Sequence, residues 1–132
     1  MKPVQKIVAI GVILILAVSS LVPPAVFSIT VKEEEDMSRQ IMEMIHKYYK
    51  IVDDPSVVAY VNNIGKRILS ALPQQPFKYR FYVIDEDVYN AFATPGGHIF
   101  VYTGLLDAME EEEELAGILG HEIAHVYCRH IS

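Results

Sequence analysis

The chain has 132 residues, of which 52% are hydrophobic, and carries a formal net charge of −6 with Cys128 as its single cysteine. This length accommodates one small domain behind an apolar N-terminal stretch. The acidic balance excludes the clustered basic face that binds nucleic acid, and a single cysteine excludes both an internal disulfide framework and a cysteine-rich zinc module.

Residues 1–31 are interpreted as a targeting segment, because Lys2 and Lys6 precede an uncharged stretch that Pro23 and Pro24 interrupt. A helix ending at Val22 would span roughly 24 Å at 1.5 Å per residue, shorter than the ~30 Å hydrocarbon core of a bilayer. This favours a cleaved signal peptide, while an uncleaved membrane anchor stays open. In both cases we expect residues 32–132 to lie outside the cytoplasm, in the periplasm or cell envelope.

Two scaffold helices are predicted next. In the first, Ile41, Met44, Ile45 and Tyr48 recur at helical spacing. His46, beside this apolar face, is interpreted as a surface or packed histidine rather than a ligand.

The second helix is predicted to begin at Asp54 and Pro55, a favourable pair for the N-cap and first turn. Pro73 and Pro76 end the helical part. The residues expected to point inward are Val57, Val61, Ile64, Ile68 and Leu72.

From Tyr79 the hydrophobic period changes to two, which is typical of strands. The segments YRFYVID (79–85), NAFAT (90–94) and HIFVY (98–102) are predicted as strands, with a Pro95-Gly96-Gly97 turn before the last. An edge of this small sheet could pair with an extended peptide through main-chain hydrogen bonds. His98 is interpreted as a strand residue rather than a ligand.

The last helix is predicted to begin near residues 110–114, where carboxylates are favourable against the helix dipole. At about 100° per residue, His121 and His125 lie about 40° apart on one face. The nearly opposite face is apolar and should be buried; it carries Leu115, Leu119, Ile123 and Val126.

The sequence HEIAH at 121–125 has the spacing of a zinc site, since two imidazoles four residues apart share one helix face. A catalytic zinc takes three protein ligands and a water whose pKa the metal lowers. Glu122, on the same turn, can take the proton of that water and return it to a leaving amine. The spacing therefore indicates Zn²⁺ as the cofactor, His121 and His125 as ligands, and Glu122 as the catalytic base.

The sequences NAFATPGGHIFVYTGLL (90–106) and ELAGILGHEIAHVYCRH (114–130) resemble the membrane-associated gluzincin family of zinc metallopeptidases. That family includes the CAAX prenyl proteases, HtpX and BepA, and the BepA-type branch likewise joins a secretion signal to a preceding two-helix segment. The resemblance implies that the strand Asn90, Ala91, Phe92 and Ala93 borders the substrate cleft. It also implies the same roles for His121, Glu122 and His125.

In this family the third ligand is a glutamate on a later helix, beyond the Arg129-His130 pair, and the residues up to Ser132 do not include it. His130 would face the core side of the helix, and Cys128 lies roughly 4.5 Å beyond His125 along the axis, so neither is expected to complete the site. We therefore expect residues 32–132 to be the N-terminal portion of a catalytic domain that is incomplete at its C-terminal end. Such a chain should bind zinc weakly and show no protease activity of its own.

The predicted fold class is α+β, with two N-terminal scaffold helices, a small sheet and the metal-binding helix of a truncated gluzincin-like catalytic domain. The predicted function of the parent protein is zinc-dependent hydrolysis of peptide bonds in polypeptide substrates, here misfolded proteins of the envelope. The alternative is a non-catalytic, degenerate peptidase-like protein that binds partners at the envelope. Neither the physiological substrate nor the oligomeric state is readable from the residues.

Overall fold

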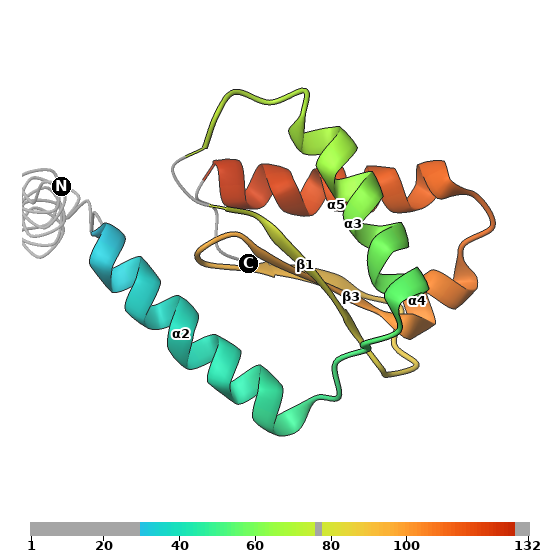
Figure 1. Ribbon diagram of the computed structural model, residues 1–132, viewed down its shortest axis with the longest axis horizontal. Helices are drawn as coiled ribbons and strands as arrows, with labels where there is room; N and C mark the ends of the chain where they lie inside the picture. The colour runs from blue at the N-terminus through green and yellow to red at the C-terminus, as the bar shows by residue number, and fades with distance from the viewer. Residues whose placement is uncertain (1–29, 76–77, 129–132) are drawn as a thin grey trace, which may run out of the picture.

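The computed structural model describes residues 30–75 and 78–128. Most of the expected targeting segment, residues 1–29, lies outside the described residues. Within the described part, no helix is long and apolar enough to cross a membrane. The elements are α2 (Val31–Tyr48), α3 (Pro55–Leu69), β1 (Arg80–Ile84), β2 (Ala91–Thr94), β3 (His98–Tyr102), α4 (Thr103–Ala108) and α5 (Glu112–Tyr127) (Figure 1). The predicted α+β class is confirmed.

The three strands form one sheet in the order β1-β3-β2, with β3 parallel to β1 and antiparallel to β2. The predicted strands and the turn between β2 and β3 are confirmed. Gly96 and Gly97 in this turn both have φ of 85°, a backbone region that L-residues with a side chain rarely adopt. Because β3 is the middle strand, β2 lies at an edge of the sheet.

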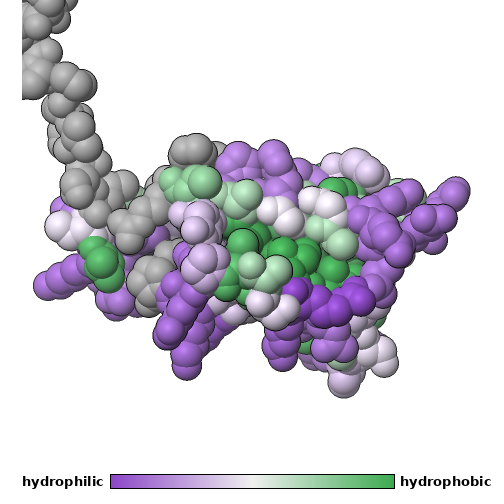
Figure 2. Space-filling model, turned by 90° about the horizontal axis from the view of Figure 1, so that it is seen from above, coloured by the Kyte–Doolittle hydropathy of each residue, from purple (hydrophilic) through white to green (hydrophobic). Residues whose placement is uncertain are grey.

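Helices α3 and α5 cover one face of the sheet, and α2 lies on the opposite side (Figure 1). The larger core lies between α3, α5 and the sheet, and partly buried side chains such as Leu69 and Ile118 pack around it. Seen from above the view of Figure 1, the visible surface has hydrophobic side chains in its middle and hydrophilic ones at its margins (Figure 2).

The α2 side of the sheet is built from stacked rings. The ring of Phe100 lies between those of Tyr82 and Phe92, with centroid distances of 4.9 and 5.0 Å. His98 continues this stack beside Tyr82, and its Nδ1 lies 3.1 Å from the Tyr82 hydroxyl. Burial lowers the pKa of His98, with a smaller effect from Arg80, so this histidine packs as a neutral ring of β3.

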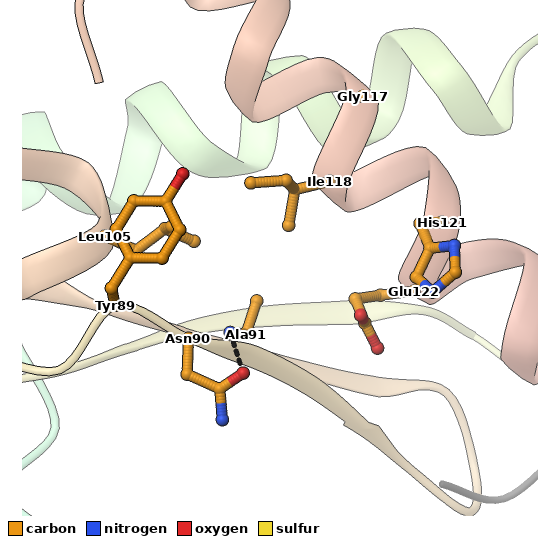
Figure 3. A pocket seen from close by; sticks show the side chains of 8 residues that line it. All are labelled: Tyr89, Asn90, Ala91, Leu105, Gly117, Ile118, His121 and Glu122. Carbon is orange, nitrogen blue, oxygen red and sulfur yellow. Dashed lines mark hydrogen bonds between the residues drawn. The ribbon is translucent and has the colours of Figure 1, made fainter. Parts of the chain in front are cut away.

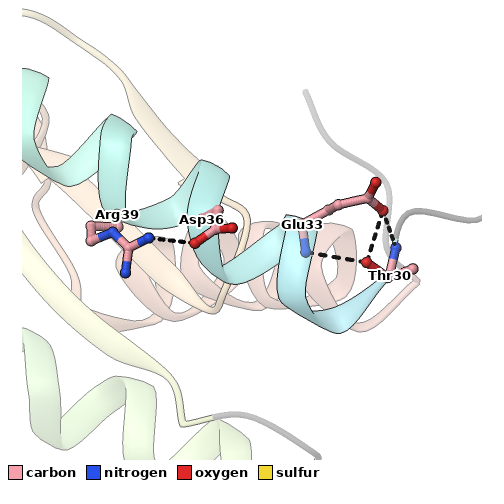
Figure 4. Close-up of polar contacts among 4 residues, drawn as sticks. All are labelled: Thr30, Glu33, Asp36 and Arg39. Carbon is pink, nitrogen blue, oxygen red and sulfur yellow. Dashed lines mark hydrogen bonds and ion pairs between the residues drawn. The ribbon is translucent and has the colours of Figure 1, made fainter.

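The helix starts follow from local capping. Asp54 accepts hydrogen bonds from the N–H groups of Ser56 and Val57, which confirms the predicted start of α3. At the start of α2, Thr30 and Glu33 form a capping box, and Asp36 pairs with Arg39 one turn later (Figure 4).

The predicted helices differ from the observed ones in two places. Helix α3 ends at Leu69, and Leu72 packs against the core from beyond its end. On α2, Met44 and Tyr48 are 55% and 69% exposed. The helix contacts the stacked rings through a different stripe of side chains, which lies to one side of Met44 and Tyr48 on the helix surface. That stripe consists of Ile41, Met42 and Ile45, with Tyr49 just past the helix.

We predict that Gly65→Ala destabilises the fold. A Cβ at Gly65 would lie closer than 3.0 Å to three ring carbons of Phe81, and overpacking of this kind costs about 1–3 kcal/mol. At Gly120 a Cβ meets no neighbouring atom of the described residues within 4 Å, so Gly120→Ala should raise the unfolding free energy by up to about 1 kcal/mol through helix propensity. Urea unfolding curves of both variants test this, and equal stabilisation of the two would contradict the packing argument.

Candidate metal centre

Helix α5 carries the candidate metal-binding residues, and its opposite face anchors it. The predicted apolar stripe of Leu115, Leu119, Ile123 and Val126 is buried, with each side chain at most 7% exposed. Glutamates occupy the first turn, which begins at Glu112 within the predicted range. The side of α5 that bears the histidines is thereby directed away from the core.

His121 and His125 converge on one point. Their Nε2 atoms lie 2.9 Å apart, and their rings are nearly perpendicular at 89°. Two nitrogens bound to one tetrahedral zinc at 2.0–2.1 Å would be roughly 3.3 Å apart, so an ion would replace the hydrogen bond between the rings, and both Nε2 lone pairs would turn toward it. The two imidazoles therefore fit the metal that their spacing predicts.

Glu122 is buried, with 8% exposure, although it lies beside the exposed His121. Figure 3 shows its side chain between α5 and the strand that carries Ala91, on the same side of the cavity as His121. Glutamate is rarely buried in this way without a partner, because desolvation penalises the carboxylate. The sequence did not reveal this burial, since it arises from the packing of α5 against β2.

A cavity of about 280 Å³ lies between the side chains of His121 and Glu122 and the start of the edge strand β2. The Asn90 side-chain oxygen accepts a hydrogen bond from the Ala91 N–H at 2.9 Å, which orients the Asn90 side chain at the start of β2, beside the cavity (Figure 3). The lining residues are Tyr89, Asn90, Ala91, Leu105, Gly117, Ile118, His121 and Glu122.

The structure brings together only part of the predicted substrate strand and the metal site. Asn90 and Ala91 line the cavity with His121 and Glu122. Phe92 stacks on Phe100 on the α2 side of the sheet, and Ala93 is buried in the larger core. A contact of these two residues with substrate would therefore use their main chain.

Within residues 30–75 and 78–128, no group of three His, Cys, Asp or Glu side chains is placed to hold a metal ion. Cys128 is exposed at the C-terminal cap of α5. His130, the other nearby residue considered as a ligand, lies outside the described residues.

The family model described as Peptidase family M48 matches residues 55–132. The putative beta-barrel assembly-enhancing protease of Vibrio cholerae serotype O1 is 30% identical over 105 residues, which is 80% of this chain and 22% of the relative. The beta-barrel assembly-enhancing protease of Escherichia coli strain K12 is 28% identical over the same shares. The mitochondrial metalloendopeptidase OMA1 of Schizosaccharomyces pombe is 39% identical over 71 residues, 54% of this chain and 21% of the relative.

The chain thus spans about a fifth of the length of these curated relatives. The match to the family model includes all of α3, the sheet and α5. The cavity and the two converging histidines therefore lie within the part of the chain that the family model describes.

We predict that His121→Ala and His125→Ala each lower zinc affinity by more than about tenfold, because losing even an outer partner of a ligand costs 10–100-fold. Titration of the full chain with zinc against a competing chelator measures the change. His46→Ala, on the exposed side of α2, is the matched control and should leave the affinity unaltered. Equal affinities in all four proteins would refute the assignment of these ligands.

Proposed function

The chain belongs to peptidase family M48, and from this we propose that it forms part of a zinc-dependent endopeptidase. His121 and His125 are the proposed metal ligands, and Glu122 is the proposed catalytic base. The family assignment agrees with the resemblance found in the sequence. We further propose residues 1–31 as a signal peptide or membrane anchor and residues 32–132 as catalytic-domain sequence. The observation that carries the proposal is the convergence of the two Nε2 atoms, 2.9 Å apart, beside the buried Glu122.

The proposed chemistry assigns a separate task to each side chain. Zinc bound at this centre would supply a Lewis acid for the peptide carbonyl. His121 and His125 hold it through Nε2, which requires both rings to be neutral and to carry their proton on Nδ1. We propose that a third ligand comes from outside the described residues.

Glu122 is placed to move the proton. Its carboxylate can accept a proton from the attacking water and then donate it to the departing amine. Its burial beside the cavity keeps competing bulk water away from the carboxylate, which strengthens its interactions with charges that develop in the reaction.

Strand β2 is proposed to hold the substrate. Within the described part of the chain it pairs with β3 on one side and has no strand on the other, and it packs against α5, which carries Glu122. An extended polypeptide added to its free edge would make main-chain hydrogen bonds along Asn90, Ala91, Phe92 and Ala93. Such binding depends little on side chains and suits unfolded polypeptides of varied sequence.

Misfolded proteins of the periplasm or cell envelope are the proposed substrates. Two observations support this placement: the apolar stretch with basic residues at the N-terminus, and the likeness to proteins named as beta-barrel assembly-enhancing proteases. Association with the membrane through residues 1–31 is part of the same proposal.

In a protein that also carries the third zinc ligand, we predict that Glu122→Gln lowers zinc-dependent cleavage of an unfolded substrate, such as reduced casein, by about 10²- to 10⁴-fold while zinc stays bound. The amide keeps the size of the side chain and removes its basicity. Glu113→Gln changes an exposed carboxylate on the first turn of α5 and should leave the rate unaltered.

Zinc content and cleavage rate are measured on the same preparations. Loss of zinc together with activity in Glu122→Gln would show a structural role for this residue. Binding of casein without cleavage by the zinc-loaded protein that carries the third ligand and an unchanged Glu122 would favour the non-catalytic alternative.

A further inference from the structure

The cavity beside Glu122 has an apolar end that the proposed catalytic roles leave unused. Tyr89 and Leu105 lie at the end away from His121, with Ile118 between them and the histidine (Figure 3). Leu105 is 1% exposed and Tyr89 is 68% exposed, so the cavity has a closed floor and one wall that faces solvent.

Gly117 leaves room in this cavity. It lines the cavity one helical turn before His121, and a Cβ built on it meets no atom within 4 Å among the described residues. Glycine is one of the least favourable residues in a helix interior, and here no neighbouring atom requires it. A Cβ at this position would occupy space in the cavity and nothing else.

We propose that the cavity is a subsite for an apolar side chain of the polypeptide substrate and that Gly117 sets the size of the side chain it accepts. This inference rests on the proposed function. The occupant follows from the lining: Tyr89, Leu105 and Ile118 offer apolar surface, while the carboxylate of Glu122 at the other end disfavours an acidic side chain.

The position of the subsite also selects which substrate residue enters it. Ala91, at the start of the edge strand, and Glu122 both line the cavity. A peptide held along β2 would therefore insert the side chain of a residue next to the cleaved bond. Selectivity for size at that residue is the expected consequence.

Tryptophan fluorescence tests the subsite without requiring catalysis. The chain contains no tryptophan, so N-acetyl-tryptophanamide can be excited selectively and its emission reports binding to the full chain. Titrations are made with a chelator present. We expect saturable binding that N-acetyl-leucinamide displaces and N-acetyl-aspartamide does not.

Gly117→Ala and Gly120→Ala form the decisive pair. Both add one methyl group to α5 in open space, but only Gly117 lines the cavity. We expect Gly117→Ala to weaken probe binding by roughly tenfold, the lower range of what one methylene contributes in an apolar pocket, and Gly120→Ala to leave it unaltered. Equal effects of the two variants, or no saturable binding to the wild type, would overturn the proposal.

Tyr89→Ala provides a second route if circular dichroism shows that Gly117→Ala is not folded. It removes the solvent-facing wall and should also weaken binding, so an unchanged affinity would overturn the proposal. A separate assay of zinc-dependent casein cleavage, made on a protein that also carries the third zinc ligand, reports on the proposed function. Absence of cleavage with size-selective probe binding retained would refute that function and leave the subsite in place.

Discussion

The geometry of the site depends on the burial of one face of α5. Leu115, Leu119, Ile123 and Val126 hold the helix against α3 and the sheet, and full burial of each such side chain contributes about 1.5–3 kcal/mol. Because these four residues fix the rotation of the helix about its axis, the opposite face, which carries His121 and His125, has a fixed orientation relative to the sheet. Two imidazoles one turn apart then meet at Nε2 without help from a loop, which is how rigid elements preorganise a metal site.

The strand order places the other half of the site. Strand β3 lies between β1 and β2, so one edge of β2 has no strand partner among the described residues. The packing of α5 against β2 brings that edge to the helix that carries His121 and Glu122. Had β2 occupied the middle of the sheet, its main-chain groups would be paired on both sides, and a peptide could not be added beside the metal centre.

Much of this arrangement was predictable from local patterns in the sequence. The stripe on α5, the Asp54-Pro55 start of α3 and the glycine turn each depend on neighbours along the chain. The burial of Glu122 and the cavity at Gly117 were not predictable, because both arise where α5 meets residues about 30 positions earlier in the chain. The exposure of Met44 and Tyr48 was missed for a related reason: hydrophobic periodicity defines an apolar face but not which part of it meets the sheet.

The cavity wall formed by the loop at Tyr89 is held by hydrogen bonds to the start of α4. The carbonyl of Glu86 accepts hydrogen bonds from the Gly104 N–H at 3.0 Å and the Thr103 hydroxyl at 2.9 Å, which ties the loop before Tyr89 to the start of α4. A Cβ at Gly104 would lie closer than 3.0 Å to the backbone nitrogen of Val88, so close approach of the loop explains the glycine. The same α4 supplies Leu105 to the cavity floor. A contact outside the cavity therefore positions the loop that leads to Tyr89: Gly104 lets this loop approach α4, and Gly117 leaves space open on the opposite side.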